Sequence, residues 1–213
     1  MCAEKANYKE LLERLAQLYP DAKPGLEFSN PYQLLIATIL SAQCTDERVN
    51  KVTKELFKVF PTPEALAKAS EEEIITFIKE CGLFRNKSKN IKATCQALVE
   101  KHSGEVPNSR EALEALPGVG RKTASVVLSN AFNVPAIAVD THVFRVANRL
   151  GLAKAKDVAA TERELKRNIP KELWSDAHHW LIYHGRQVCK ARKPVCEKCN
   201  LIDLCKTNKK STS

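Results

Sequence analysis

Apolar side chains recur at helical spacing along nearly the whole chain, and this pattern constrains the fold more than any other feature. Leu11, Leu15 and Leu18 show it near the N-terminus, where they lie three or four residues apart until Pro20 ends the pattern. No stretch alternates apolar and polar residues as a half-buried strand does, and no hairpin dipeptide or internal repeat is present. The sequence therefore predicts an all-α fold.

Start and stop signals divide this pattern into separate helices. Thr62-Pro63 opens one helix, and the capping box that begins at Ser70 opens another, which we expect to stop at Gly82. Residues 21–25 and 133–135 have the composition of linkers, and the chain between them holds about six helices. The predicted helices cover about residues 8–18, 31–42, 63 onward, 71–82, 86–101, 109–115, 121–132, 143–150 and 173–185, whereas the charged stretch 153–171 gives no clear signal.

The overall charge is compatible with a polyanionic partner. Lys and Arg total 34 against 25 Asp and Glu, a formal net charge of +9, although many basic proteins bind no nucleic acid. No segment approaches the ~20 apolar residues that span a bilayer, and the N-terminus lacks the apolar core of a signal peptide. We therefore expect no membrane segment and a cytoplasmic location, where eight cysteines do not form a disulfide framework.

Four of the eight cysteines crowd into the last 25 residues, with the spacing Cys189-x6-Cys196-x2-Cys199-x5-Cys205. Four closely spaced thiolates in such a chain usually bind metal, and tetrahedral sulfur ligation fits zinc or an iron–sulfur cluster. Zinc sites usually pair two short Cys-x2–4-Cys knuckles, and only one short pair exists here. The wider gaps favour a [4Fe–4S] cluster, with zinc as the alternative.

The loop between the first two of these cysteines is basic, because Lys190, Arg192 and Lys193 make up half of its six residues. A cluster that holds both ends of the loop would present these charges to a phosphate backbone. The alternative is a solvated charged loop with no partner.

A glycine-rich turn, Leu116-Pro117-Gly118-Val119-Gly120, separates two predicted helices. Gly118 and Gly120 let backbone N–H groups approach an anion, and the positive end of the following helix points the same way. Arg121 and Lys122 add charge, so the turn is suited to gripping a phosphate without reading sequence. An ordinary connection between helices is the alternative.

Several motifs carry a family resemblance that covers nearly the whole chain. Leu116 to Val127 resembles the helix-hairpin-helix signature of DNA-binding proteins, and residues 137–146, Ile-Ala-Val-Asp-Thr-His-Val-Phe-Arg-Val, follow after a short gap. Together with the cysteine spacing and the segments 40–46 and 178–181, they resemble the endonuclease III family. The family consists of bifunctional DNA glycosylases and abasic-site lyases with a helix-hairpin-helix motif.

The resemblance implies roles for Lys122 and Asp140. Lys122 matches the family's nucleophile, which attacks C1′ of the deoxyribose, expels the damaged base and forms a Schiff base before β-elimination cuts the strand. Asp140 matches the catalytic aspartate, which we expect to stabilise the positive sugar-like transition state. From the residues alone, Lys122 is better explained as a phosphate contact than as a nucleophile, and Asp140 is also a candidate N-cap for the helix at Thr141.

The target base must leave the helical stack before C1′ becomes reachable, so the resemblance also implies residues that fill the gap. Gln43, in Ser41-Ala42-Gln43, matches the family's intruding glutamine, and Leu83, after Gly82, matches its intruding leucine. The alternatives are an ordinary polar residue at a helix end for Gln43 and helix-end packing for Leu83.

The resemblance implies two helical domains with a DNA-binding cleft between them. We expect a six-helix barrel domain over 24–134, with the helix-hairpin-helix motif at about 109–132, and a discontinuous iron–sulfur domain from 1–23 and 135–213. The implied partner is double-stranded DNA with an oxidised pyrimidine or an abasic site, bound by a monomer that carries one [4Fe–4S] cluster.

Two other functions share most of these features. An adenine-mismatch glycosylase of the same superfamily would keep the hairpin, aspartate and cysteines, but such members lack lysine at the position of Lys122. A non-catalytic iron–sulfur protein that binds DNA or transfers electrons would also fit the charge, hairpin and cysteines. Only the pairing of Lys122 with Asp140 argues against this last alternative.

Overall fold

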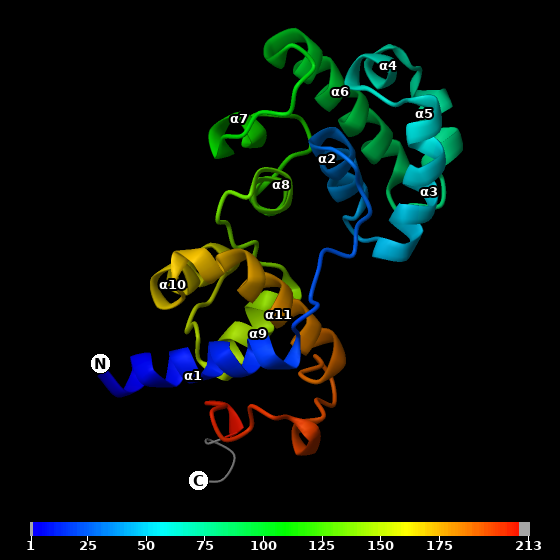
Figure 1. The fold of residues 1–213 in the computed structure, drawn as a ribbon. Helices are drawn as coiled ribbons and strands as arrows, with labels where there is room; N and C mark the ends of the chain where they lie inside the picture. The colour runs from blue at the N-terminus through cyan, green and yellow to red at the C-terminus, as the bar shows by residue number, and fades with distance from the viewer. Residues whose placement is uncertain (1, 209–213) are drawn as a thin grey trace. The chain divides into compact units, whose positions relative to one another are not determined.

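The structure, a computed structural model, describes residues 2–208 and confirms the all-α prediction, because this part of the chain contains helices and loops but no strand. None of its helices is long and apolar enough to cross a membrane. The α-helices are α1 (Cys2–Leu18), α2 (Pro31–Leu40), α3 (Asp46–Val59), α4 (Pro63–Lys68), α5 (Glu71–Ile78), α6 (Phe84–His102), α7 (Arg110–Glu114), α8 (Arg121–Phe132), α9 (Thr141–Leu150), α10 (Val158–Asn168) and α11 (Trp174–Gln187); the short 3-10 helices are η1 (Lys171–Leu173) and η2 (Cys196–Lys198) (Figure 1).

Contacts along the chain define two compact units. The central unit is Pro24–Val134, and the terminal unit combines Met1–Lys23 with Pro135–Ser213. The terminal unit is therefore built from both ends of the chain, and each unit is described separately below.

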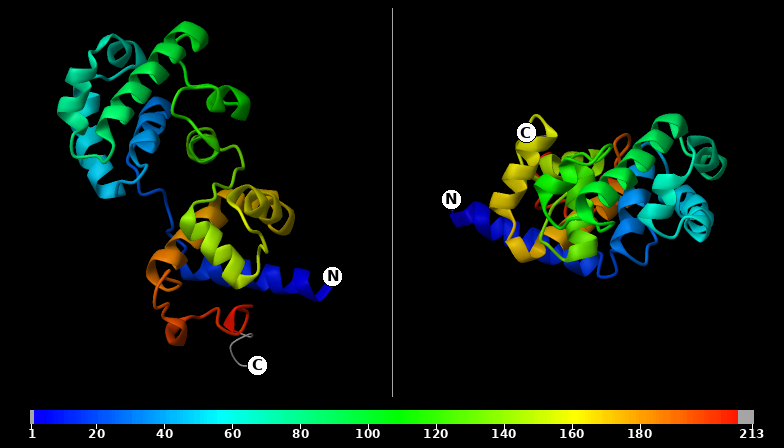
Figure 2. Two further views of the ribbon diagram at one scale, coloured as in Figure 1. Left: turned by 180° about the vertical axis from the view of Figure 1, so that it is seen from behind. Right: turned by 90° about the horizontal axis from the view of Figure 1, so that it is seen from above.

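The central unit is organised around α2 and α6. Figures 1 and 2 show α6 running beside α4 and α5, and α2 packs against α6, α3 and α8. The cap of α2 is local, since the Asn30 side chain accepts a hydrogen bond from the backbone N–H of Gln33 and Pro31 occupies the first turn. The α2 helix is apolar on nearly all sides and almost wholly buried, as a central core helix must be. Other fully buried side chains of the central unit are Leu56, Leu66, Ile74, Ile78, Ile91, Leu98 and Leu113.

Seven helices lie in the central unit, one more than the six expected from the sequence. The additional helix is α3, which is not among the helices predicted from the sequence. Thr45 caps it by accepting a hydrogen bond from the N–H of Arg48, and Val49, Val52 and Leu56 form its buried stripe. These signals are ordinary ones that the sequence does contain.

Two boundaries in the central unit differ from the expectation. The helix that starts at the Ser70 capping box ends at Ile78, not at Gly82, and the next helix begins at Phe84, two residues before the predicted start. Leu83 adopts a left-handed conformation with φ of 59° as the N-cap of α6, so the turn is completed by a leucine. Gly82 therefore lies within this turn and does not end the helix.

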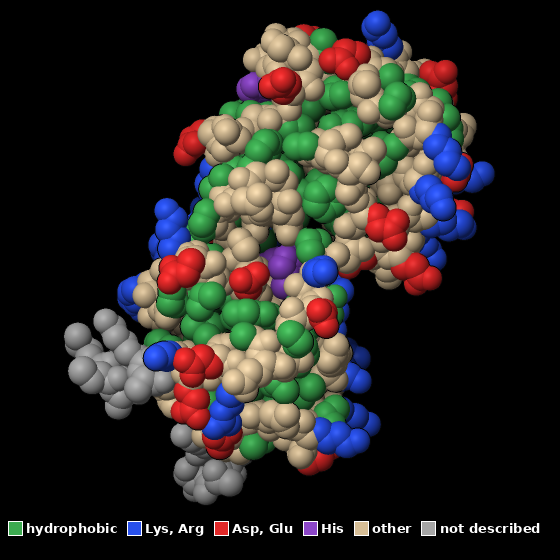
Figure 3. Space-filling view, viewed as in Figure 1, with side chains coloured by type: hydrophobic (Ala, Val, Ile, Leu, Met, Phe, Trp, Pro, Cys, Tyr) green, Lys and Arg blue, Asp and Glu red, His purple; other side chains and the backbone are tan. Residues whose placement is uncertain are grey.

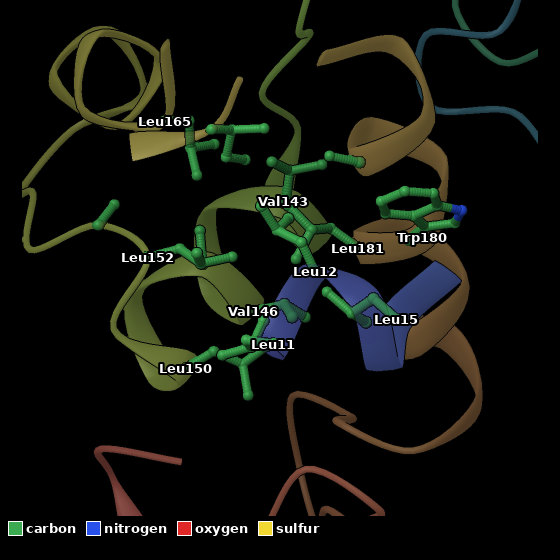
Figure 4. Close-up of a cluster of buried hydrophobic side chains, with 14 of the residues drawn as sticks. Leu11, Leu12, Leu15, Val143, Val146, Leu150, Leu152, Leu165, Trp180 and Leu181 are labelled. Atoms are coloured by element: carbon green, nitrogen blue, oxygen red, sulfur yellow. The ribbon is translucent and has the colours of Figure 1, made fainter. Parts of the chain in front are cut away.

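The terminal unit has its core between α1, α9 and α11 (Figure 4). Leu11, Leu12 and Leu15 of α1 point toward Val143, Val146 and Leu150 of α9 and toward Trp180 and Leu181 of α11. Each fully buried leucine contributes roughly 1.5–3 kcal/mol relative to exposure, so this interface joins the two ends of the chain strongly. Leu152 and Leu165 extend the core toward α10.

The α10 helix lies in the stretch 153–171, for which no helix was predicted. Asp157 caps it by accepting a hydrogen bond from the N–H of Ala160. Its buried face contains Thr161 and Glu162 beside Leu165, so two of these three buried positions are polar. The regular spacing of apolar residues that marks a helix is therefore absent here, although the capping residue Asp157 is present.

Candidate active site and nucleic-acid interface

The turn between α7 and α8 in the central unit has the geometry of a phosphate-binding hairpin. Gly118 has φ of +72°, and a Cβ there would lie 2.8 Å from the Cβ of Asn90. Both the backbone conformation and the close approach of Asn90 therefore require glycine at this position. Gly120 has no neighbouring atom within 4 Å of an added Cβ, so the backbone beside it is open. Val119 is buried and fixes the turn by donating its N–H to the Leu116 carbonyl at 3.1 Å.

Lys122 is the second residue of α8, whose N-cap is Gly120. Its side chain is exposed, and so is that of Arg121. The first-turn N–H groups have no intrahelical acceptor, so they can donate to an anion at this end of the helix. The structure therefore places an accessible amine directly beside the open backbone of the glycine turn.

Asp140 is the N-cap of α9 in the terminal unit. Its Oδ1 accepts hydrogen bonds from the backbone N–H groups of His142 and Val143, both at 2.8 Å, so the expected capping role is confirmed. Oδ2 lies 3.5 Å from Nδ1 of His142, and the side chain is only 16% exposed. The carboxylate is thus held rigidly at a helix N-terminus, with the orientation fixed through one oxygen.

Gln43 and Leu83 lie on two turns that meet in the central unit. Both residues are exposed and both have left-handed backbones, with φ of 53° and 59°. A Cβ on Gly82 would lie 3.4 Å from the carbonyl oxygen of Gln43, so the turns are in contact. Leu83 is 57% exposed, so more than half of its side chain is in solvent and not packed at the helix end.

The four C-terminal cysteines line one cavity of about 240 Å³ in the terminal unit, together with Arg149, His184 and Pro194. Among residues 2–208, no three His, Cys, Asp or Glu side chains are placed to hold a single metal ion. Four cysteines around one cavity are a donor set that fits a sulfur-ligated metal group.

Two arginines of α9 hold the chain next to this cavity. Arg149 donates to the carbonyls of Lys190 and Ala191 at 2.7 and 3.2 Å, and Arg145 donates to the carbonyl of Cys189 at 3.0 Å. Sequence reasoning missed both, because these contacts join residues more than forty positions apart.

The side chains of Lys190, Arg192 and Lys193 are exposed beyond the segment that the arginines anchor. Figure 3 shows Lys and Arg side chains on the surface of both units, mixed with acidic ones on the face displayed. The basic loop therefore combines a fixed backbone with solvent-exposed charges, as a phosphate contact requires.

The histidines of α11 are buried structural residues. Nδ1 of His178 lies 2.7 Å from the carbonyl oxygen of Ala138, and Nδ1 of His184 lies 2.9 Å from the Tyr19 hydroxyl. Burial lowers the pKa of His184 to about 4, so its ring is neutral. Nε2 of His184 lies 3.7 Å from Sγ of Cys199, an outer contact to the cysteine cavity that the sequence did not reveal.

Comparison with known proteins gives concordant matches. Residues 36–171 match the HhH-GPD superfamily of base excision DNA repair proteins. Endonuclease III of Haemophilus influenzae is 52% identical over 201 residues, which cover 94% of this chain and 95% of the relative. Endonuclease III of Escherichia coli strain K12 is 52% identical over 206 residues, which cover 97% and 98%.

A solved structure of a trapped endonuclease III–DNA covalent intermediate has a TM-score of 0.92 and 49% sequence identity, and the match covers 98% of this chain and 99% of that one. These matches do not favour an adenine-mismatch glycosylase or a non-catalytic iron–sulfur protein. They agree with the helix-hairpin-helix turn, the capping aspartate and the cysteine cavity described above. The chain therefore belongs to the endonuclease III family of HhH-GPD base excision repair enzymes, which act as DNA glycosylases and abasic-site lyases.

Proposed function

We propose that the chain removes oxidised pyrimidines, such as thymine glycol, from double-stranded DNA and then cuts the strand at the abasic site. The observation that carries this proposal is the exposed amine of Lys122 in the first turn of α8, beside the open backbone at Gly120. A helix N-terminus with free N–H groups attracts the phosphate, so the amine next to it would lie close to the sugar.

The chemistry begins when the neutral Lys122 amine attacks C1′ and the bond to the damaged base breaks. The base leaves with the bonding electrons and takes up a proton. The attacking nitrogen loses one proton, the C1′–O4′ bond breaks and O4′ takes up a proton, which gives a protonated Schiff base. Loss of a proton from C2′ then expels the 3′ phosphate, with the positively charged nitrogen as the electron sink. The lysine is then released by water. In these reaction steps Lys122 acts first as the nucleophile, and its nitrogen then serves as the electron sink.

Asp140 is proposed to stabilise the positive charge that develops on the sugar as the base departs. A carboxylate held by two backbone hydrogen bonds needs no reorganisation at the moment of reaction, which makes its field effective.

The exposed side chains of Gln43 and Leu83 are proposed to enter the stack when the target nucleotide is flipped out. Their left-handed turns project both side chains from one place on the central unit. Backbone N–H groups at Gly118, Val119 and Gly120, the Arg121 side chain and the basic loop would contact phosphates. These contacts support duplex DNA as the partner. We further propose that the protein is a monomer and acts in the cytoplasm.

Cys189, Cys196, Cys199 and Cys205 are proposed to hold a [4Fe–4S] cluster, in keeping with the cavity they line. Such a cluster can exchange one electron, but the steps above depend only on the side chains of the chain itself. Its proposed role is to fix both ends of the loop that contains Lys190, Arg192 and Lys193. Iron and acid-labile sulfide in the purified protein, in equal amounts, are expected; zinc without iron would contradict this assignment.

Borohydride trapping tests the nucleophile. Incubation with abasic-site duplex DNA and borohydride is expected to give a covalent adduct with the wild type and none with Lys122→Gln. Lys122→Arg is the matched variant, because arginine keeps a positive phosphate contact but forms no Schiff base. Retention of DNA binding by Lys122→Arg without an adduct would support the assignment. An adduct that persists in both variants would refute it.

A further inference from the structure

The two contacting turns of the central unit bring a pair of cysteines together. Cys44 follows Gln43 directly, and Cys81 precedes Gly82, whose Cβ position lies 3.4 Å from the Gln43 carbonyl oxygen. Each turn is closed by its own backbone hydrogen bond, from Cys44 N–H to the Ser41 carbonyl at 3.1 Å and from Cys81 N–H to the Ile78 carbonyl at 2.8 Å. The two cysteines are thus 37 positions apart in sequence but lie on neighbouring backbones.

Both thiols are free, and they differ in access to solvent. Cys44 is half-buried, whereas Cys81 is 1% exposed. Burial, together with the nearby Cys44, raises the pKa of Cys81 to about 11. The pair therefore consists of one accessible thiol and one shielded thiol within interaction distance.

A buried cation lies beside this pair. Lys87 of α6 is 4% exposed, and its Nζ donates to the carbonyl of Leu40, at the C-terminus of α2, over 2.8 Å. Its charge acts on both Cys44 and Cys81, and Arg48 also lies near enough to favour the thiolate of Cys81. Burial lowers the pKa of Lys87, while the two cysteines act in the opposite direction. Neighbouring cations favour a thiolate, so Lys87 and Arg48 oppose part of the effect of burial on Cys81.

We propose that Cys44 and Cys81 are a redox-sensitive dithiol that closes reversibly to an intramolecular disulfide. The oxidant is a low-molecular-weight disulfide. The Cys44 thiolate attacks one of its sulfurs, so a mixed disulfide forms on Cys44 and one thiolate leaves. The Cys81 thiolate then attacks Sγ of Cys44, the protein disulfide forms and the second small thiolate leaves. Two protein thiols are oxidised, one external disulfide is reduced to two thiols, and the two protons end on those thiols or in solvent.

The disulfide would staple the turn that carries Gln43 to the turn that carries Leu83. A cross-link between them removes the independent movement of the two side chains. Since these side chains are proposed to enter the DNA stack, oxidation is expected to slow engagement of damaged DNA. This consequence rests on the proposed function, whereas formation of the disulfide does not.

The bond is tested on the intact, metal-loaded protein in redox buffers of reduced and oxidised glutathione. Tryptic peptides are analysed by mass spectrometry without reduction. The wild type is expected to give a cross-linked peptide containing Cys44 and Cys81, and dithiothreitol is expected to remove it. Cys81→Ser should stop at glutathione attached to Cys44, and Cys44→Ser should leave Cys81 unmodified. Cys95→Ser is the control, since that thiol is fully buried in the same unit and should not alter the cross-link.

Only glutathionylated Cys44 in the oxidised wild type, or an unmodified pair at the most oxidising ratio, would overturn the proposal. If Cys81→Ser does not fold, Cys44→Ser still tests the proposal, because Cys81 should then stay unmodified. The consequence is measured separately as association of oxidised and reduced protein with abasic-site DNA. A slower association that dithiothreitol restores, and that is absent in Cys44→Ser, is expected. An equal rate despite a complete cross-link would refute the stapling effect alone, and loss of DNA binding by the reduced protein would instead count against the proposed function.

Discussion

The hydroxyl of Tyr19, just after α1, lies 2.9 Å from Nδ1 of His184 on α11. Both side chains are buried, and the ring is neutral. In the tautomer that carries its proton on Nε2, Nδ1 accepts a hydrogen bond from the hydroxyl, and the Nε2 N–H faces Sγ of Cys199, 3.7 Å away. A single buried contact thus links the N-terminal segment to the wall of the cysteine cavity.

Replacement of Tyr19 by phenylalanine is expected to lower the free energy of unfolding by about 1–3 kcal/mol, because Nδ1 of His184 is left buried without its partner. Urea titration of the metal-loaded protein measures this value. Tyr8→Phe, on a half-buried tyrosine of α1, serves as the control and should change stability by less than about 0.5 kcal/mol. Equal effects of the two substitutions would show that the hydrogen bond to His184 contributes nothing specific.

Substitution of Asp140 should separate its capping role from its catalytic role. Asparagine caps a helix about as well as aspartate, so Asp140→Asn is expected to preserve stability within about 0.5 kcal/mol while base release falls roughly 100-fold or more. Asp140→Ala should lose base release and also about 1 kcal/mol of stability. Single-turnover release of thymine glycol and urea unfolding measure the two effects.

The N-cap of α10 provides the control for this pair. Asp157 also accepts a capping hydrogen bond, from the N–H of Ala160 at 2.8 Å. Asp157→Ala should therefore cost about 1 kcal/mol and leave base release unchanged. Unchanged base release in Asp140→Asn would remove Asp140 from the proposed chemistry.

The two glycines of the hairpin turn should respond differently to alanine. Gly118→Ala forces a left-handed alanine against Asn90, so it is expected to cost at least about 1–2 kcal/mol of stability and to weaken DNA binding. Gly120→Ala introduces no clash, because nothing lies within 4 Å of the added Cβ, and its stability should change by less than about 1 kcal/mol. Weaker binding of abasic-site DNA by Gly120→Ala at normal stability would report the loss of close phosphate approach. Wild-type affinity in both variants would contradict the phosphate-binding role of the turn.

The basic loop makes a prediction about salt. If Lys190 and Arg192 contact phosphates, each alanine substitution should reduce the slope of log affinity against log salt by about 0.9. Lys58→Ala is a suitable control, because Lys58 is already paired with Glu55 at 2.7 Å on the surface of α3. Affinities measured between low and moderate salt on an abasic-site duplex provide the slopes. Slopes that do not differ from that of the wild type would identify the loop as solvated only.

Local signals predicted much of the fold, and each feature that they missed has its own cause. Thr62, Ser70 and Asp140 cap the helices that follow them, as their sequence context indicates. The α10 helix was not predicted because its buried face includes Thr161 and Glu162, which interrupt the apolar spacing expected of a buried helix face. Helix boundaries near Gly82 were wrong because a non-glycine residue, Leu83, adopts the left-handed conformation.

The candidate site also combines local features, which the sequence predicts, with long-range contacts, which it does not. The place of Lys122 in the first turn of α8 follows from the glycine turn before it, and both are local features. The contacts of Arg149 with Lys190 and of Tyr19 with His184 join residues 41 and 165 positions apart, so no local pattern encodes them. The contact between the Gln43 and Leu83 turns, and hence the cysteine pair beneath it, likewise depends on tertiary packing.

The order of synthesis gives the divided terminal unit a consequence for folding. The apolar stripe of α1, with Leu11, Leu12 and Leu15, leaves the ribosome first, but the helices that cover it, α9 and α11, are made last. The central unit can fold during this interval, because domains generally fold as units. A nascent chain that stalls before α11 therefore exposes three leucines and is a target for chaperones and proteases, whereas completed chains bury them.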